Sequence, residues 1–295
     1  MRISGYSVED FFQHYAGRTA GRQCVSAVFV SFGVLWLLIE PAGLFFPEKF
    51  NWGWKGYAAL LLLSLVVGLI RARPRRAISR KLPPSGVEIG VAAGDVFTRK
   101  GNVVVGTNDT FDTDTRSPQR IIASRSVQGQ LLERIFRNDT EELDRQIDGS
   151  LAGLPYEACP AKTFGKQRRY AIGAVATVEH EDTRFFLPAF TTMSDSLPAH
   201  VESSLESLNL ALTSVWEAIR KGGHREPVFV PVIGADLARL NLSKTLLIQI
   251  IVLSFVSSAV QRGVAPSLTV CVRDADIAEI DMAALDDWLR RLCAV

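Results

Sequence analysis

Two strand-like runs of this sequence end in short polar segments that could bind a small ligand. The run at residues 101–107, GNVVVGT, continues into NDTFDT, and the run at residues 86–97, GVEIGVAAGDVF, places Asp95 directly after its apolar part. In open α/β sheets, ligands bind at the carboxyl ends of parallel strands. An ordinary Gly/Asn/Asp loop and a turn capped by Asp95 are the alternative explanations.

The thiol and imidazole groups of the chain do not form a recognisable site. No CxxC pair, no metal-ligand spacing and none of the HExxH, GxSxG or GxxxxGK[ST] motifs is present, which gives no support to a metalloprotease, a serine hydrolase or a P-loop enzyme. The cysteines are isolated and are expected to be reduced: Cys24, Cys159, Cys271 and Cys293.

The composition allows one large domain or one domain with accessory segments. The 295 residues are 47% hydrophobic, so the chain is far too apolar to be disordered. Its net charge is only +2, with 33 basic and 31 acidic residues. This balance argues against a nucleic-acid-binding protein, which would have a strongly basic domain or stripe.

Two uncharged apolar runs near the start predict a transmembrane hairpin over residues 23–72. Residues 24–39 and 56–70 each lack charges, and both can be extended toward the roughly 20 residues that cross a bilayer. A cleaved signal peptide and two buried helices of a soluble domain are the alternatives. The second hydrophobic run follows the first at once, and residues 61–65 are apolar on every side, so the hairpin is favoured.

The charges that flank the hairpin predict its orientation. Arg18 and Arg22 precede the first run, and a basic, proline-containing segment at residues 73–86 follows the second. By the positive-inside rule, residues 1–22 form a cytoplasmic segment, residues 73–86 form a linker, and residues 87–295 form a cytoplasmic domain.

The predicted cytoplasmic domain alternates strand patterns with helix patterns, which indicates an α/β fold with a layered sheet. The sheet is expected to be mixed, because residues 169–180 and 183–190 resemble an antiparallel hairpin. A helix is predicted to begin near residue 196, with Asp195 or Ser196 as its cap. The apolar stretch at residues 245–260 contains Gln249 and three serines, so it is predicted to lie on the sheet rather than to form a third span.

Several stretches together resemble the macro domain of the Thoeris anti-phage effectors that carry two membrane spans. They are residues 87–97, 101–113, 124–136 and 227–255, and the resemblance covers most of residues 87–295. It implies a macro-like three-layer α/β/α domain with a mixed sheet that binds an ADP-ribose-type nucleotide.

The resemblance also implies a set of ligand-binding residues. Asp95 would hold adenine beside the Val96 backbone, the residues after the second strand would approach a ribose, and a glycine-containing loop would wrap the diphosphate. The full predicted set is Asp95, Val96, Gly106, Thr107, Asn108, Ser126, Gln128, Gly129, Gly234, Ala235, Asp236 and Leu237. A helix cap is the competing role for Ser126. Phe111 is a further candidate for stacking on the ligand, with core packing as the favoured alternative.

The function implied by the resemblance is that of a membrane effector rather than an enzyme. A TIR-domain partner protein would make the nucleotide signal, no further cofactor is expected, and the effector would act as a homo-oligomer in the lipid bilayer of the bacterial inner membrane. The sequence departs from the glycine-rich loops of the family at DTFDT and at Ala235 and Asp236, which weakens the alternative of a membrane-anchored ADP-ribosyl hydrolase. A passive tethered binding module is the third possibility.

Overall fold

A computed structural model of the protein describes residues 18–45, 53–71, 75–116, 121–197, 200–234 and 242–294. The chain divides into two compact units. The first contains the described residues up to Arg76 together with Asp281–Ala283, and the second contains the remainder from Ala77 onward. The predicted cytoplasmic segment at residues 1–22 lies largely outside the described residues.

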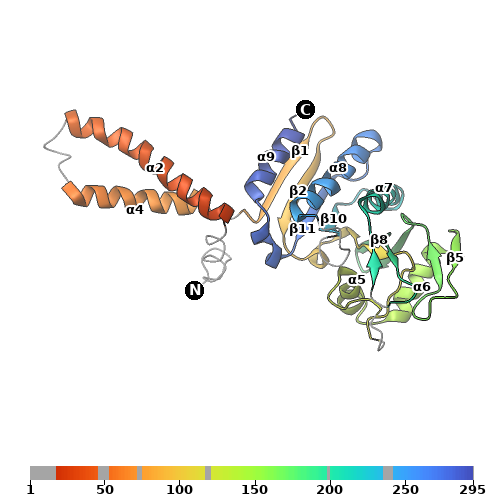
Figure 1. Ribbon diagram of the computed structural model, residues 1–295. Helices are drawn as coiled ribbons and strands as arrows, with labels where there is room; N and C mark the ends of the chain where they lie inside the picture. Colours follow the sequence, from red (N-terminus) through yellow and green to blue (C-terminus); the bar gives the residue numbers. More distant parts are fainter. Residues whose placement is uncertain are drawn as a thin grey trace. The chain divides into compact units, whose positions relative to one another are not determined.

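The first unit is a pair of packed apolar helices, α2 (Arg18–Phe45) and α4 (Gly53–Arg71) (Figure 1). Gly68 permits their close approach, because a Cβ atom at this position would lie only 2.3 Å from a methyl carbon of Val28. The rings of Phe32, Trp36 and Tyr57 also pack together, with centroids 5.7 to 6.2 Å apart.

Three helices are long and apolar enough to cross a membrane by length and composition. They comprise residues 25–45 within α2, residues 53–70 within α4, and α8 (Lys244–Arg262). Most of the side chains described in α2 and α4 are exposed, whereas one face of α8 is buried within the second unit. α8 contacts strand β11 and helix α7, which agrees with its prediction as a helix that lies on the sheet.

The second unit is built around a mixed nine-stranded sheet. Its main path is β1 (Ala77–Leu82), β2 (Val87–Ala93), β11 (Ser267–Val272), β10 (Val228–Pro231), β3 (Gly101–Val104), β8 (Thr183–Met193) and β4 (Thr107–Asn108). From β2 to β4 all neighbours on this path are parallel. β7 (Val175–His180) pairs antiparallel with β8, which confirms the predicted hairpin. β9 (Val201–Glu202) also pairs antiparallel with β8.

Strand β1 corrects the predicted linker at residues 73–86. Residues 77–82 pair antiparallel with β2, from Ala77 opposite Ala92 to Leu82 opposite Val87. Ile78 and Leu82 are buried. The basic residues between them fit an outer strand, because one side of such a strand faces solvent. The Arg80 guanidinium lies 2.6 Å from the buried carboxylate of Asp286 on α9. The second unit therefore begins at Ala77, not at Val87.

Helices cover the sheet in layers. α7 (Leu205–Gly222) and α8 pack together through Trp216 and Phe255, and they contact β8 and β11 respectively. α5 (Val127–Gln130), the π-helical turn η2 (Leu131–Ile135) and α6 (Thr140–Leu151) cover a core that includes Val103, Phe185 and Cys271. α9 (Met282–Leu292) contacts β1 through the Arg80–Asp286 pair (Figure 1). This arrangement confirms the predicted α/β fold with a mixed sheet.

Candidate functional site

The parallel strands bring several predicted ligand-binding residues to the carboxyl end of the sheet, which we call the strand edge. Asp95 follows β2, Gly234 follows β10, and Gly106 follows β3. Because these strands point the same way, the three residues lie beyond the same edge. β11 and β10 separate β2 from β3, so the Asp95 end and the Gly106 end are roughly 14 Å apart at the usual strand spacing.

Asp95 presents a half-exposed carboxylate at this edge. It caps the 3₁₀ turn η1 (Val96–Thr98), with its Oδ1 atom accepting from the Phe97 amide at 3.0 Å. Its Oδ2 atom pairs with the Arg134 guanidinium, which lies 5.3 Å above the centre of the Phe97 ring. The Asp95 side chain remains 36% exposed, so it both caps the turn and stays accessible to a ligand. Val96 beside it is buried.

Thr107 is buried, and Gly106 is partly buried and tightly packed against its neighbours. A Cβ atom on Gly106 would lie 2.5 Å from a ring carbon of Phe190, which explains why only glycine fits. The Thr107 hydroxyl donates to the Pro188 carbonyl at 3.2 Å. These two residues shape the edge from inside rather than through exposed side chains.

Asn108 holds the start of the following loop and keeps one donor free. Its Oδ1 atom accepts from the Thr110 amide at 3.1 Å and from the Asp112 amide at 3.2 Å, and it lies 3.1 Å from the Thr110 hydroxyl oxygen. The side chain is only 2% exposed. Within the described part of the chain its Nδ2 atom is buried without a hydrogen-bond partner. A buried amide donor without a partner is unfavourable, so this atom is the one polar group of the segment left for an acceptor.

The rest of the polar segment after β4 is occupied by internal ion pairs. Asp112 is fully buried against Lys162, whose Nζ atom lies 2.8 Å from Oδ2 and also donates to the Lys166 carbonyl at 2.8 Å. The Lys166 amide donates to the other carboxylate oxygen of Asp112 at 2.6 Å. Lys162 lies fifty residues from Asp112, and the sequence offers no motif that would have predicted the pairing.

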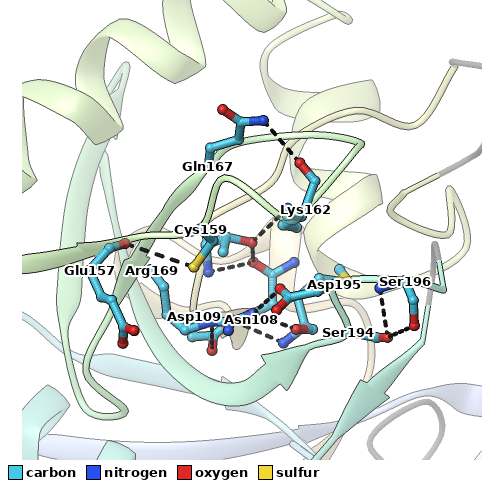
Figure 2. Close-up of polar contacts among 12 residues, drawn as sticks. Asn108, Asp109, Glu157, Cys159, Lys162, Gln167, Arg169, Ser194, Asp195 and Ser196 are labelled. Carbon is cyan, nitrogen blue, oxygen red and sulfur yellow. Dashed lines mark hydrogen bonds and ion pairs between the residues drawn. The ribbon is translucent and has the colours of Figure 1, made fainter.

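Asp109 forms the second of these pairs, with Arg169 on β6 (Arg168–Tyr170). One carboxylate oxygen accepts from the Met193 amide at 2.9 Å, and the other lies 2.9 Å from the Arg169 Nε atom, although the angle there is too poor for a hydrogen bond. Burial raises the pKa of the Asp109 carboxyl, and the Met193 amide and the Arg169 charge only partly oppose this effect. Arg169 also donates to Asp195 at 2.9 Å (Figure 2).

The loop between β5 (Tyr156–Ala158) and β6 places Lys162 beneath the edge. The Cys159 amide donates to the Gln167 carbonyl at 2.9 Å, and the Gln167 side chain donates to the Lys162 carbonyl at 2.9 Å (Figure 2). These crossed bonds close the loop and fix the backbone of Lys162. The buried cation is therefore held by its own loop as well as by Asp112.

The predicted ligand-binding residues Ser126, Gln128 and Gly129 make close contacts within the protein. The Ser126 hydroxyl caps α5 by accepting from the Gly129 amide at 3.0 Å, which bears out the competing role of a helix cap. The Gln128 side chain donates to the Asp112 carbonyl at 2.5 Å. Gly129 is packed so tightly that a Cβ atom would lie 2.4 Å from the Ala123 carbonyl oxygen.

The remaining predicted residues lie in or near the loop after β10. Gly234 adopts a φ of 88°, which favours glycine. Ala235, Asp236 and Leu237 fall outside the described residues. Phe111 is fully buried, with its ring packed edge-on against Tyr170 at 5.6 Å, so it belongs to the core.

A shallow hollow of about 250 Å³ lies beside the end of β2. It is lined by Ala77, Ile78, Ser79, Gly90, Val91, Ala92, Arg99 and Thr269. No group of three or more His, Cys, Asp or Glu side chains suited to a metal ion occurs within the described ranges.

Comparisons with known proteins match most of the second unit to one family. A family model described as Thoeris protein ThsA, Macro domain matches residues 89–273. The fold is similar to a mutant of the Oceanobacillus iheyensis macrodomain, with 10% identity, a TM-score of 0.51, and coverage of 74% of this chain and 100% of that chain. It is likewise similar to the Oceanobacillus iheyensis macrodomain with ADP, at 10% identity, a TM-score of 0.50, and coverage of 73% and 97%. No protein with a curated description matches.

Proposed function

The chain belongs to the family of the Thoeris protein ThsA macro domain, and on that premise we propose that it is a membrane effector gated by an ADP-ribose-type nucleotide. The second unit binds the nucleotide in the cytoplasm, and the apolar helices of the first unit breach the bacterial inner membrane. The observation that carries this proposal is the family match over residues 89–273 in a chain that also carries two apolar helices.

The strand edge supports nucleotide binding through two groups at its opposite ends. The exposed carboxylate of Asp95 is an acceptor for the exocyclic amino group of adenine. The Nδ2 atom of Asn108, which has no hydrogen-bond partner among the described residues, is a donor for a ribose hydroxyl or a phosphate oxygen. Gly234, between them in the sheet order, lets the backbone approach a diphosphate. The Oceanobacillus iheyensis structure with ADP has the same fold, which further supports a nucleotide ligand.

The internal ion pairs support a binder rather than an ADP-ribosyl hydrolase. General-base catalysis requires a carboxylate within reach of a water molecule at the reacting carbon. Asp109 and Asp112 are buried and paired with Arg169 and Lys162, so neither is placed to activate water. Asp95 is exposed, but it is expected at the adenine end of the ligand, away from the distal ribose.

Gating requires the ligand to favour an active arrangement of the hairpins. A shift from about 1% to 99% active needs a differential affinity of roughly 5.5 kcal/mol. A homo-oligomer can reach this free energy by adding the contributions of several binding sites. It also explains how the pore is enclosed, because two helices alone cannot form one. A TIR-domain partner protein is the proposed source of the signal.

The experiment uses the full chain in liposomes loaded with a fluorescent dye. Added ADP-ribose is expected to bind, to cause dye release, and to be recovered intact by chromatography. Turnover of ADP-ribosylated protein without leakage would instead identify the hydrolase. Binding with neither effect would identify a passive tether, and absence of binding to ADP-ribose and its derivatives would overturn the proposal.

A further inference from the structure

Arg99 is a half-buried cation with no carboxylate counter-ion among the described residues. It follows η1 in the chain, and its guanidinium lies 5.8 Å from the centre of the Phe229 ring. Its Nε atom is buried without a hydrogen-bond partner in the described residues, and no carboxylate among them lies within ion-pair distance. A buried guanidinium nitrogen left without a partner is unfavourable unless an acceptor reaches it.

The hollow beside Arg99 has a floor of small side chains. Ala77 and Ser79 of β1 lie opposite Ala92 and Gly90 of β2, and Gly90 also lies opposite Thr269 of β11. Side chains two residues apart on a strand share a face, so these small residues form a continuous shallow surface with Arg99 at its border. A larger residue at Gly90 would crowd the Ile78 carbonyl, which lies 3.1 Å from the position of a Cβ atom.

Among the described residues, the groups around Arg99 do not neutralise its charge, although its guanidinium interacts with the Cys271 thiol. The Asp95 carboxylate is paired with Arg134 and with the Phe97 amide. Burial raises the pKa of the nearby Cys271 thiol to about 11, so this group is uncharged at neutral pH. Glu88 lies on the same face of β2 as Gly90, but it does not line the hollow. The hollow is therefore electropositive.

We infer that this hollow binds an anionic group, a phosphate or a carboxylate, through the guanidinium of Arg99. The planar guanidinium presents paired donors that match either oxyanion. The hollow lies over β1, β2 and β11, whereas Asn108 lies beyond β3 and β8, so the site is separate from the ribose end of the proposed nucleotide site. The inference does not require the proposed function.

The hollow lies at the start of the strand that follows the apolar hairpin in the sequence. Ala77, Ile78 and Ser79 in its lining are the first residues of β1, and only residues 72–76 separate this strand from the end of α4 at Arg71. An anion seated here contacts the strand that continues directly from the apolar hairpin.

The test uses the full chain in nanodiscs of zwitterionic lipid. Thermal unfolding is followed by tryptophan fluorescence with added inorganic phosphate or acetate, against chloride at the same ionic strength. Phosphate is expected to stabilise the wild type. Arg99→Gln should weaken the apparent affinity by roughly tenfold or more, because a charge-assisted hydrogen bond is lost. Arg125→Gln, at an exposed arginine, is the matched control and should bind as the wild type does.

An anionic lipid, a second variant and a separate binding measurement complete the test. Nanodiscs that contain phosphatidylglycerol test a lipid headgroup as the source of the anion, and an Arg99-dependent stabilisation in either arm supports the site. If Arg99→Gln fails to fold, Ser79→Tyr fills the hollow while Arg99 remains, and it should abolish the phosphate effect. Stabilisation of equal size in Arg99→Gln and wild type, or none in any arm, would overturn the inference. ADP-ribose binding, measured by calorimetry on the same samples, tests the proposed function separately.

Discussion

The Nζ atom of Lys162 lies 2.8 Å from the Oδ2 atom of Asp112, and neither side chain has exposed surface. The pair joins the segment after β4 to the loop between β5 and β6. Because the Thr110 hydroxyl donates to the same carboxylate, the pair also supports the turn that fixes Asn108. A buried, fully bonded cluster thus holds the free amide of Asn108 in place.

Lys162→Met should lower the free energy of unfolding by about 3 to 5 kcal/mol, because it leaves the Asp112 charge buried without a partner. Urea unfolding of the full chain in detergent, followed by near-UV circular dichroism, measures the change. Lys100→Met is the matched control, since its pair with Asp182 is largely exposed, and it should change stability by less than about 1 kcal/mol. Equal effects of the two substitutions would show that the Lys162 pair is solvated.

The sequence was sufficient to predict the layered fold because each layer follows a local rule. Alternating strand and helix patterns predicted the α/β class, and polar residues in the apolar stretch at 245–260 predicted its place on the sheet. The common edge of Asp95, Gly106 and Gly234 also follows from parallel strand direction alone. These features depend on the hydrophobic periodicity and on the strand direction, both of which can be inferred from a single sequence.

The errors arose where tertiary contacts decide the structure. Residues 77–82 were predicted to be part of a linker because the segment is rich in basic residues and proline. The pairing of β1 with β2, which buries Ile78, is a tertiary contact that the local sequence does not show. α7 was predicted to begin near residue 196, but β9 pairs with β8 first, and the helix begins at Leu205 after the Ser204 cap. The assignment of Ser126 and Gln128 to the ligand stays a prediction; in the structure the Ser126 hydroxyl donates to the Ala123 carbonyl and the Gln128 side chain donates to the Asp112 carbonyl.

Gly106→Ala should lower the free energy of unfolding by about 1 to 3 kcal/mol, because its Cβ atom would overlap the Phe190 ring. Gly149→Ala in α6 is the control, since a Cβ atom there meets nothing within 4 Å. Alanine in a helix interior should instead stabilise the protein by roughly 0.5 to 1 kcal/mol. Phe190→Leu combined with Gly106→Ala should restore part of the loss. The same urea titration gives all three values, and a neutral Gly106→Ala would contradict the close packing.

Asp95→Asn should weaken ADP-ribose binding by about 1 to 3 kcal/mol, because the amide would present a donor where the adenine amino group needs an acceptor. Asparagine can still cap η1 through its carbonyl oxygen, so the turn should persist. Calorimetry on the full chain in detergent measures the affinity. Asp182→Asn, at a carboxylate that is 81% exposed, should bind with unchanged affinity. Unchanged binding in Asp95→Asn would remove this residue from the site.

The Cys271 thiol should react slowly with iodoacetamide in the folded protein. Burial raises its pKa from 9.0 to about 11, and only the thiolate reacts. The pKa of this thiol is higher in the folded state than in the unfolded state. Its contribution to the free energy of unfolding is therefore fully present below about pH 9 and is lost as the pH rises through 11. Mass spectrometry of the labelled peptide should show the rate rising about tenfold per pH unit between 8 and 10. A rate that levels off near pH 9 would indicate an exposed thiol.

Leu62→Arg should abolish leakage while leaving nucleotide binding intact. Leu62 lies in the middle of α4, where its side chain is 63% exposed, as expected for contact with lipid. An arginine near the centre of a membrane helix disfavours insertion by about 2.5 to 3.5 kcal/mol. Binding is measured in detergent, where insertion is not required, and dye release is measured in liposomes. Leu62→Ala is the matched control and should retain both activities, since it removes bulk without adding charge. If Leu62→Arg still inserted and released dye on addition of ADP-ribose, the breach would not depend on an apolar α4, and the assignment of the hairpin as the effector would fail.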